Sequence, residues 1–269
     1  IGLAIKRKRA ARRVIGIFRR ESTMKKALKR GAVDRGTMDL RSGVRDADLI
    51  VIAAPVHSIP ALAAQAIRYA KKGAVITDAG STKGWIVGKI EGMMRHYPGV
   101  SFIGSHPMAG SEHAGVEFAK NDLLEGSPCI VTVTPRSDSK ELSKVSGFWR
   151  SLGARVKLMS PSEHDRTVSM ISHLPHVVAF SLAGAVPDKD IACSAEGFKD
   201  TTRVASSDPD LWADIFLTNR SAIKYAGRLF SRRLSVLLRA VEKNDRRSLL
   251  AALKEAKSKR DRFLYGKKA

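Results

Sequence analysis

Residues 48–55, DLIVIAAP, form the stretch that decides the fold of this chain. They are a near-continuous apolar run, as expected of a strand buried on both faces of a parallel sheet. A helical pattern follows, and residues 74–80, AVITDAG, then repeat the apolar run. Further strands are predicted at 13–18, 101–105, 128–134 and 155–159, and further helices at 22–30, 85–94 and 139–151. This alternation indicates a doubly wound parallel sheet.

The second half of the chain shows no strand pattern after residue 160. Residues 160–163, SPSE, form a capping box with proline at the first helical position, which predicts a long helix toward Ala185. Another helix is predicted after Asp208, and residues 243–245 break it. We therefore predict a Rossmann-like α/β dinucleotide-binding domain over 1–160 and an all-α domain over 161–269. The apolar stripe of the second domain is long, which predicts a homodimer interface or simply a core.

The charge balance is strongly basic, with 48 Lys and Arg against 26 Asp and Glu and a net charge of +22. Such a field attracts nucleic acid, acidic membranes or anionic small molecules. The basic residues are scattered and no nucleic-acid-binding motif accompanies them, so a solvated basic surface is favoured. Two cysteines, Cys129 and Cys193, are too few for a disulfide framework. With no apolar run of membrane-spanning length and no signal peptide, we predict a cytoplasmic protein.

Ligands of open α/β sheets bind beyond the carboxyl ends of the strands. Residues 53–55, AAP, end one strand with small side chains that let a ribose or nicotinamide approach. Ser81 and His106 follow two neighbouring strands, within DAGSTK and GSHPMAG. A hydroxyl beside an imidazole could bind a substrate alcohol and take its proton. A lone histidine is more often structural, but its place at a strand end favours chemistry.

Two polar clusters lie in the helical half. Residues 171–176, ISHLPH, place His173 and His176 around Pro175, which kinks a helix and exposes polar groups. A histidine pair could bind metal, but no third ligand lies at a recognisable spacing, so we predict none. Arg203, in DTTR, could form a two-pronged pair with a carboxylate or be an ordinary surface residue.

Five segments of the chain stand in the order found in prephenate and arogenate dehydrogenases of tyrosine biosynthesis. In chain order they are AAPV, DAGSTK, GSHPMAGSE, ISHLPH and GFKDTTRVASSDPDLW. The chain resembles this family over nearly its whole length. The resemblance implies oxidative decarboxylation of prephenate to 4-hydroxyphenylpyruvate with hydride transfer to NAD or NADP. Conversion of arogenate to tyrosine is the alternative. Tyrosine is then a candidate active-site inhibitor.

The resemblance also implies roles for individual residues. His106 is the base that deprotonates the C4 hydroxyl of the substrate ring, and Ser81 hydrogen-bonds that hydroxyl. Arg203 pairs with a substrate carboxylate, and Trp212 packs near the pocket from a partner subunit. The implied substrate-binding residues are Ser111, Glu112, Ser172, His173, His176, Asp200 and Arg203. The predicted cofactor-binding residues are Arg19, Arg20, Ala53, Ala54 and Pro55.

Two departures from the family pattern concern the cofactor. Residues 1–4, IGLA, match the helix that follows the family's Gly-rich loop, so we expect the first strand and that loop to be missing from this sequence. We expect roughly ten or more residues upstream in the complete protein. Without the loop, the chain as given should bind the cofactor weakly. Phe18 stands where an acidic residue usually holds the ribose 2′-hydroxyl, and Arg19 and Arg20 follow it. Two arginines suit a 2′-phosphate, which favours NADP over NAD.

Two other functions compete with this interpretation. A two-domain dehydrogenase of the hydroxyacid or 6-phosphogluconate type would carry a catalytic lysine on the long helix, where this chain has His173 and His176. A basic nucleic-acid-binding module on a Rossmann-like scaffold would instead show salt-dependent DNA binding without turnover.

Overall fold

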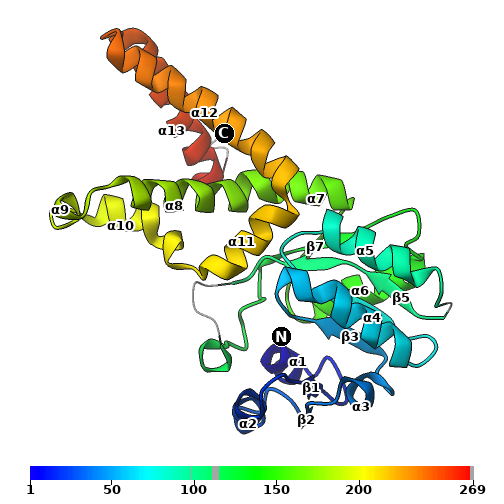
Figure 1. Cartoon of the computed structure of the whole chain (residues 1–269). Helices are drawn as coiled ribbons and strands as arrows, with labels where there is room; N and C mark the ends of the chain where they lie inside the picture. The colour runs from blue at the N-terminus through cyan, green and yellow to red at the C-terminus, as the bar shows by residue number, and fades with distance from the viewer. Residues whose placement is uncertain (98, 111–114, 267–269) are drawn as a thin grey trace. The chain divides into compact units, whose positions relative to one another are not determined.

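The computed structural model of the chain describes residues 1–97, 99–110 and 115–266 (Figure 1). They form two compact units, 1–220 and 221–269. The strands are β1 (Ile15–Ile17), β2 (Arg35–Thr37), β3 (Leu49–Ile52), β4 (Val75–Asp78), β5 (Ser101–Ile103), β6 (Ser105–Pro107), β7 (Pro128–Thr132) and β8 (Arg155–Met159). The helices among them are α1 (Gly2–Lys8), α2 (Glu21–Lys29), α3 (Leu40–Val44), α4 (Ile59–Tyr69), α5 (Gly84–Met94) and α6 (Ser139–Ser151).

The predicted parallel α/β architecture is confirmed, with two additions. β3, β4 and β5 form one parallel ladder, β1 and β2 form another, and β7 pairs with β8 in parallel. β2 and α3 were not predicted, because a three-residue strand of sequence RGT has no apolar alternation to detect. β6 pairs antiparallel with β7, so the chain changes ladder at Gly104, directly after β5. A Cβ at Gly104 would lie 2.6 Å from Thr132 Oγ1, so this crossing tolerates no side chain.

Helices cover both faces of the strands, as a doubly wound sheet requires. On one face, Ile76 of β4 packs with Ile86 of α5 and the apolar side of α4. On the other face, Val75 of the same strand packs with α1 and with Trp149 of α6. Because successive residues of β4 point to opposite faces and both faces are covered, all four of its residues are buried.

The first unit continues as helices after β8: α7 (Pro161–Val168), α8 (Leu174–Ala185), α9 (Asp188–Ile191), α10 (Glu196–Thr202) and α11 (Pro209–Thr218). The predicted caps are confirmed, since Ser160 Oγ accepts from the Glu163 N–H at 3.2 Å and Asp208 caps α11. A π-helical turn, Ser169–His173, joins α7 to α8. Pro175 explains it, because its ring clashes with the carbonyl four residues earlier and the backbone widens there.

The resulting helical segment, Pro161–Ala185, is long and apolar enough to cross a membrane by length and composition alone. On those two criteria, the expectation that no such run exists is wrong. Core helices of globular proteins pass the same test, and only 28% of the apolar window is buried in this chain.

The second unit is a helical hairpin made of α12 (Arg220–Glu242), which begins at the unit boundary, and α13 (Arg246–Tyr265). Asp245 caps α13 by accepting from the Ser248 N–H at 3.0 Å, and the Arg233 guanidinium pairs with Glu255 across the hairpin. Large apolar side chains remain exposed on it, among them Tyr225, Phe230, Leu234, Leu238, Val241, Leu253 and Phe263.

Candidate active site

The site is built around the carboxyl end of β4, where Asp78 begins the loop DAGSTK. Lys83 from the end of this loop is fully buried, and its ammonium binds the Asp78 carboxylate and the Ser105 carbonyl oxygen, the latter at 2.9 Å. The other Asp78 oxygen accepts from the Ser105 N–H at 3.1 Å. The buried ion pair therefore fixes β6 against the end of β4, and β6 carries His106.

His106 lies inside β6, paired with Ile130 of β7, and retains 8% of its exposure. Its Nδ1 lies 2.9 Å from Nε2 of His164 on α7. The other nitrogen of His164, Nδ1, lies 2.8 Å from Asp165 Oδ1. The same carboxylate accepts from the backbone N–H groups of Lys83 and Gly84, at 2.7 and 2.8 Å, at the start of α5. Helix α7 is thus held to the α/β part of the unit by the residues that contact His106.

The chain of contacts determines where the protons sit. The Asp165 carboxylate can only accept, so His164 carries its proton on Nδ1 and presents a lone pair at Nε2. His106 then donates from Nδ1 to that lone pair, which leaves its own Nε2 unprotonated in the neutral ring. The arrangement is the Asp–His pairing of a hydrolase triad lengthened by one imidazole. It prepares His106 to accept a proton.

The electrostatic surroundings keep His106 neutral. Burial is the main cause that lowers the pKa of His106 well below its usual value, and the nearby His164 and Lys83 lower it further. Burial also lowers the pKa of His164, although the hydrogen bond to Asp165 opposes this. A neutral imidazole at pH 7 is the state that a general base requires.

A second histidine cluster follows on α8. His176 stacks on Trp212 of α11, with ring centroids 3.4 Å apart, and its Nδ1 donates to the Ser172 carbonyl oxygen at 2.9 Å. His173 forms a T-shaped pair with the same indole, with ring centroids 6.0 Å apart, and hydrogen-bonds to Asn219. The family resemblance implied that Trp212 packs near the pocket of a partner subunit. The structure shows Trp212 buried against histidines of its own chain, and its contribution to a partner's pocket stays a prediction.

The remaining predicted residues are only partly brought together. Ser81 lies half-buried just past β4, and within the described part of the chain no hydrogen bond joins it to His106. Arg203 begins a 3₁₀ turn after α10 and is close enough to His176 to lower the pKa of that ring, after the larger effect of burial. Asp200 is exposed on α10. Ser111 and Glu112 lie outside the described residues.

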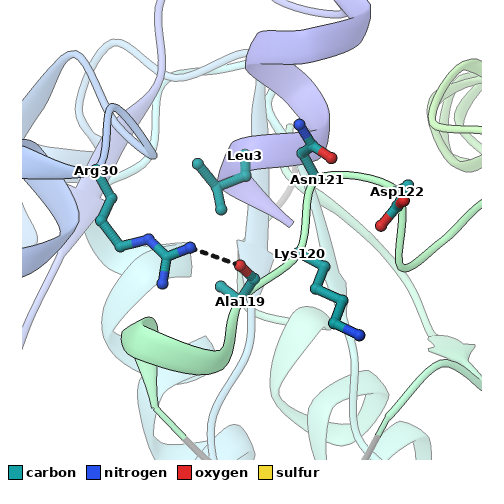
Figure 2. Close-up of a pocket in the computed structure, with 6 residues that line it drawn as sticks. All are labelled: Leu3, Arg30, Ala119, Lys120, Asn121 and Asp122. Carbon is teal, nitrogen blue, oxygen red and sulfur yellow. Dashed lines mark hydrogen bonds between the residues drawn. The ribbon is translucent and has the colours of Figure 1, made fainter.

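The predicted cofactor residues occupy the ends of two strands. Ala53, Ala54 and Pro55 follow β3, with Ala53 and Pro55 exposed. Arg19 and Arg20 are exposed between β1 and α2. Small exposed residues and exposed cationic side chains at these ends are compatible with a bound dinucleotide. None of the predicted site residues that the structure describes lines the hollow of about 430 Å³ shown in Figure 2, which lies between α1, the end of α2 and residues 119–122.

Comparisons with known proteins decide the family. Residues 1–158 match the nucleotide-binding domain of prephenate dehydrogenase, and residues 160–255 match its dimerization domain. The chain belongs to the prephenate dehydrogenase family.

The relatives include proteins named as prephenate, cyclohexadienyl and arogenate dehydrogenases. Prephenate dehydrogenase of Bacillus subtilis is 34% identical over 97% of this chain and 72% of its own length. Cyclohexadienyl dehydrogenase of Zymomonas mobilis is 34% identical over 84% of this chain and 79% of its own length. Prephenate dehydrogenase of A. aeolicus, solved with hydroxyphenyl propionate and NAD+, superposes with a TM-score of 0.89 at 32% identity, covering 97% of this chain and 93% of that one.

As a prephenate or arogenate dehydrogenase, the chain is an NAD(P)-dependent oxidoreductase of tyrosine biosynthesis, as its motifs predicted. Sequence reasoning missed the residues that orient the histidines: Lys83, His164, Asp165 and Asn219. His164 and Asp165 directly follow the capping box that was recognised, so a search for polar pairs on that helix could have found them. Nothing local distinguishes Asn219 from a helix-ending residue.

Proposed function

We propose that this prephenate dehydrogenase oxidatively decarboxylates prephenate, with His106 as the general base for the C4 hydroxyl. One observation carries the assignment: the contacts of His106 Nδ1 with His164, and of His164 with Asp165, leave His106 Nε2 as the proton acceptor. His164 and Asp165 are positioning residues, since they act through His106.

The reaction balances with this base. The O–H bond at C4 breaks as its proton passes to His106 Nε2, and the oxygen forms the C–O double bond that expels the C4 hydride. NAD(P)+, when bound, supplies the hydride acceptor. The bond between the ring and its carboxylate breaks and carbon dioxide leaves, and the electron pair completes the aromatic ring as a phenolate. The phenolate takes the proton back from His106, which gives 4-hydroxyphenylpyruvate and restores the neutral base. Ser81 hydrogen-bonds the C4 oxygen and orients it.

One substrate carboxylate is bound by a cation of the helical part. Arg203 takes this carboxylate through its guanidinium, and His176 lies beside Arg203. The further substrate-binding residues in this proposal are Ser111, Glu112, Ser172, His173 and Asp200. We place the division between the nucleotide-binding domain and the helical domain after residue 160. Arogenate, in which an amino group replaces the keto group of the side chain, is the alternative substrate.

NADP is the favoured cofactor in this proposal. Arg19 and Arg20 supply two exposed guanidinium groups for a 2′-phosphate, and residues 53–55 offer a close approach to the dinucleotide. Comparison of kcat/KM for NADP+ and NAD+, each with prephenate and with arogenate, tests both choices. A clear preference for NAD+, as bound in the A. aeolicus relative, would contradict the role of the arginine pair.

We also propose a cytoplasmic homodimer that forms through the helical part. The match to a dimerization domain supports it, as do the exposed apolar side chains of α12 and α13. Tyrosine, which resembles the product, is expected to inhibit at the same site. Sedimentation tests the dimer, and a competitive pattern against prephenate tests the inhibition.

The His106→Ala variant tests the base directly. Loss of a general base lowers kcat about 100- to 10,000-fold. Equilibrium binding of prephenate is the control, since a base removed without other damage leaves binding nearly intact. Turnover near the wild-type rate in His106→Ala would remove His106 from the mechanism.

A further inference from the structure

Asn219, the residue between α11 and α12, has a side chain whose orientation is determined by its neighbours. Its Nδ2 lies 2.9 Å from the Asp165 carbonyl oxygen and 3.1 Å from His173 Nδ1, and only 5% of the residue is exposed. A carbonyl oxygen only accepts hydrogen bonds, so the amide atom that faces it is the nitrogen and not Oδ1. The amide nitrogen is in turn only a donor, and it therefore donates to both neighbours.

This donor fixes the tautomer of His173. Because Nδ1 accepts from Asn219, the neutral ring carries its proton on Nε2. Burial lowers the pKa of His173 to about 4, with His164 and His176 adding to the effect and Asp165 opposing it. The ring is therefore neutral at pH 7, and its Nε2–H is a hydrogen-bond donor.

That donor has no acceptor. Within the described residues, Nε2 of His173 is buried without a hydrogen-bond partner, and the residue is 1% exposed. Buried donors are nearly always satisfied, because leaving one unpaired forfeits its hydration without return. The ring is near the catalytic base, since its charge would lower the pKa of His106. An acceptor missing beside a reaction centre points to a ligand.

We propose that Asn219 holds His173 as the Nε2–H tautomer so that His173 donates a hydrogen bond to an oxygen of the ligand bound beside His106. The two histidines then have opposite tasks: His106 presents a lone pair to the hydroxyl proton, and His173 presents an N–H to an acceptor oxygen. The acceptor is a carboxylate or carbonyl oxygen of the substrate or the carboxamide oxygen of the nicotinamide. This inference rests on the proposed function for the identity of those ligands.

Two matched variants separate the two nitrogens of His173. In His173→Asn, Oδ1 can replace Nδ1 as the acceptor for Asn219, but the donor at Nε2 is lost. In His173→Gln, the amide nitrogen can replace the Nε2–H donor. We expect ligand affinity, measured by calorimetry, to fall about tenfold or more in His173→Asn and to stay within a few-fold of wild type in His173→Gln.

Separate titrations with prephenate, NADP+ and NAD+ identify the source of the oxygen. If His173→Asn loses affinity for prephenate alone, the acceptor is an oxygen of the substrate. If it loses affinity for the dinucleotides alone, the acceptor is the carboxamide oxygen of the nicotinamide. Equal affinities in wild type and in His173→Asn for all three ligands would mean that the N–H serves a buried water, and would overturn the ligand assignment.

Nitrogen-15 spectra of labelled histidine side chains test the tautomer without turnover. The ligand-free wild-type protein is expected to show His173 with an unprotonated Nδ1. In Asn219→Asp the new carboxylate accepts from Nδ1–H, so the proton moves to Nδ1. A wild-type ring protonated at Nδ1 would overturn the role of Asn219, whatever the His106→Ala variant shows. Conversely, an active His106→Ala variant would refute the base and leave this spectrum unchanged.

Discussion

Because His173 stays neutral when it is buried, the free energy of unfolding should fall at acidic pH. The pKa of His173 is about 4 in the folded chain against 6.5 for an ordinary histidine, mainly because the ring is buried. Between these two pH values the unfolded chain binds the proton and the folded chain does not. Stability is therefore highest above about pH 6.5 and falls as the pH drops toward 4.

The size of this effect follows from the shift. A difference of about 2.5 pKa units corresponds to roughly 3 kcal/mol at 1.36 kcal/mol per unit. The His173→Gln variant removes the titrating group and keeps a side chain that can donate. Between pH 7 and pH 4, the free energy of unfolding of the wild type should fall by about 3 kcal/mol more than that of the variant.

Urea unfolding at a series of pH values, followed by tryptophan fluorescence, measures this difference. His106 and His164 are buried in both proteins, so the effect of their own burial enters both curves equally. Ile215→Val, a buried apolar change on α11, is the control, because it lowers stability without removing a proton site and its curve should run parallel to wild type. A His173→Gln curve that also runs parallel to wild type would refute the argument.

Three further predictions concern the residues around the base. His164→Phe leaves His106 Nδ1 without its acceptor and should lower kcat about tenfold or more. His164→Gln keeps an acceptor and should recover part of the rate. Equal rates in the two variants would contradict the tautomer argument. Gly84→Ala places a Cβ 2.8 Å from Asp165 Oδ2, so it should displace that carboxylate and lower kcat at nearly unchanged affinity for prephenate. The control is Gly88→Ala on the same helix, which should behave as wild type because a Cβ there meets open space. The pKa of His106 is depressed, so the acid limb of kcat/KM should lie below pH 6.5, with activity lost as the pH falls through that pKa; an acid limb above pH 6.5 would contradict the burial argument.

The sequence predicted those features that depend on neighbouring residues. The apolar runs at 48–55 and 74–80 are β3 and β4, because a strand buried on both faces must be apolar throughout. Ser160 and Asp208 cap helices, because a side-chain oxygen there reaches backbone N–H groups within its own turn. The motifs around His106 also identified the family, because they lie in a fixed order along the chain.

Only the tertiary structure decided how the histidines are oriented. His106 and His164 are 58 residues apart, and Asn219 and His173 are 46 apart, so no local pattern connects them. The π-helical turn before Pro175 alters which residues of the segment share a face, and a regular helical period does not anticipate this. The sequence by itself thus determined the family and placed His106 directly after a buried strand, β5, whereas the structure puts it inside the short strand β6 that follows. The fold determined which ring nitrogen of His106 and of His173 carries a proton, because a tautomer is set by the hydrogen-bond partner of the ring, and the partners of these two rings are distant in the sequence.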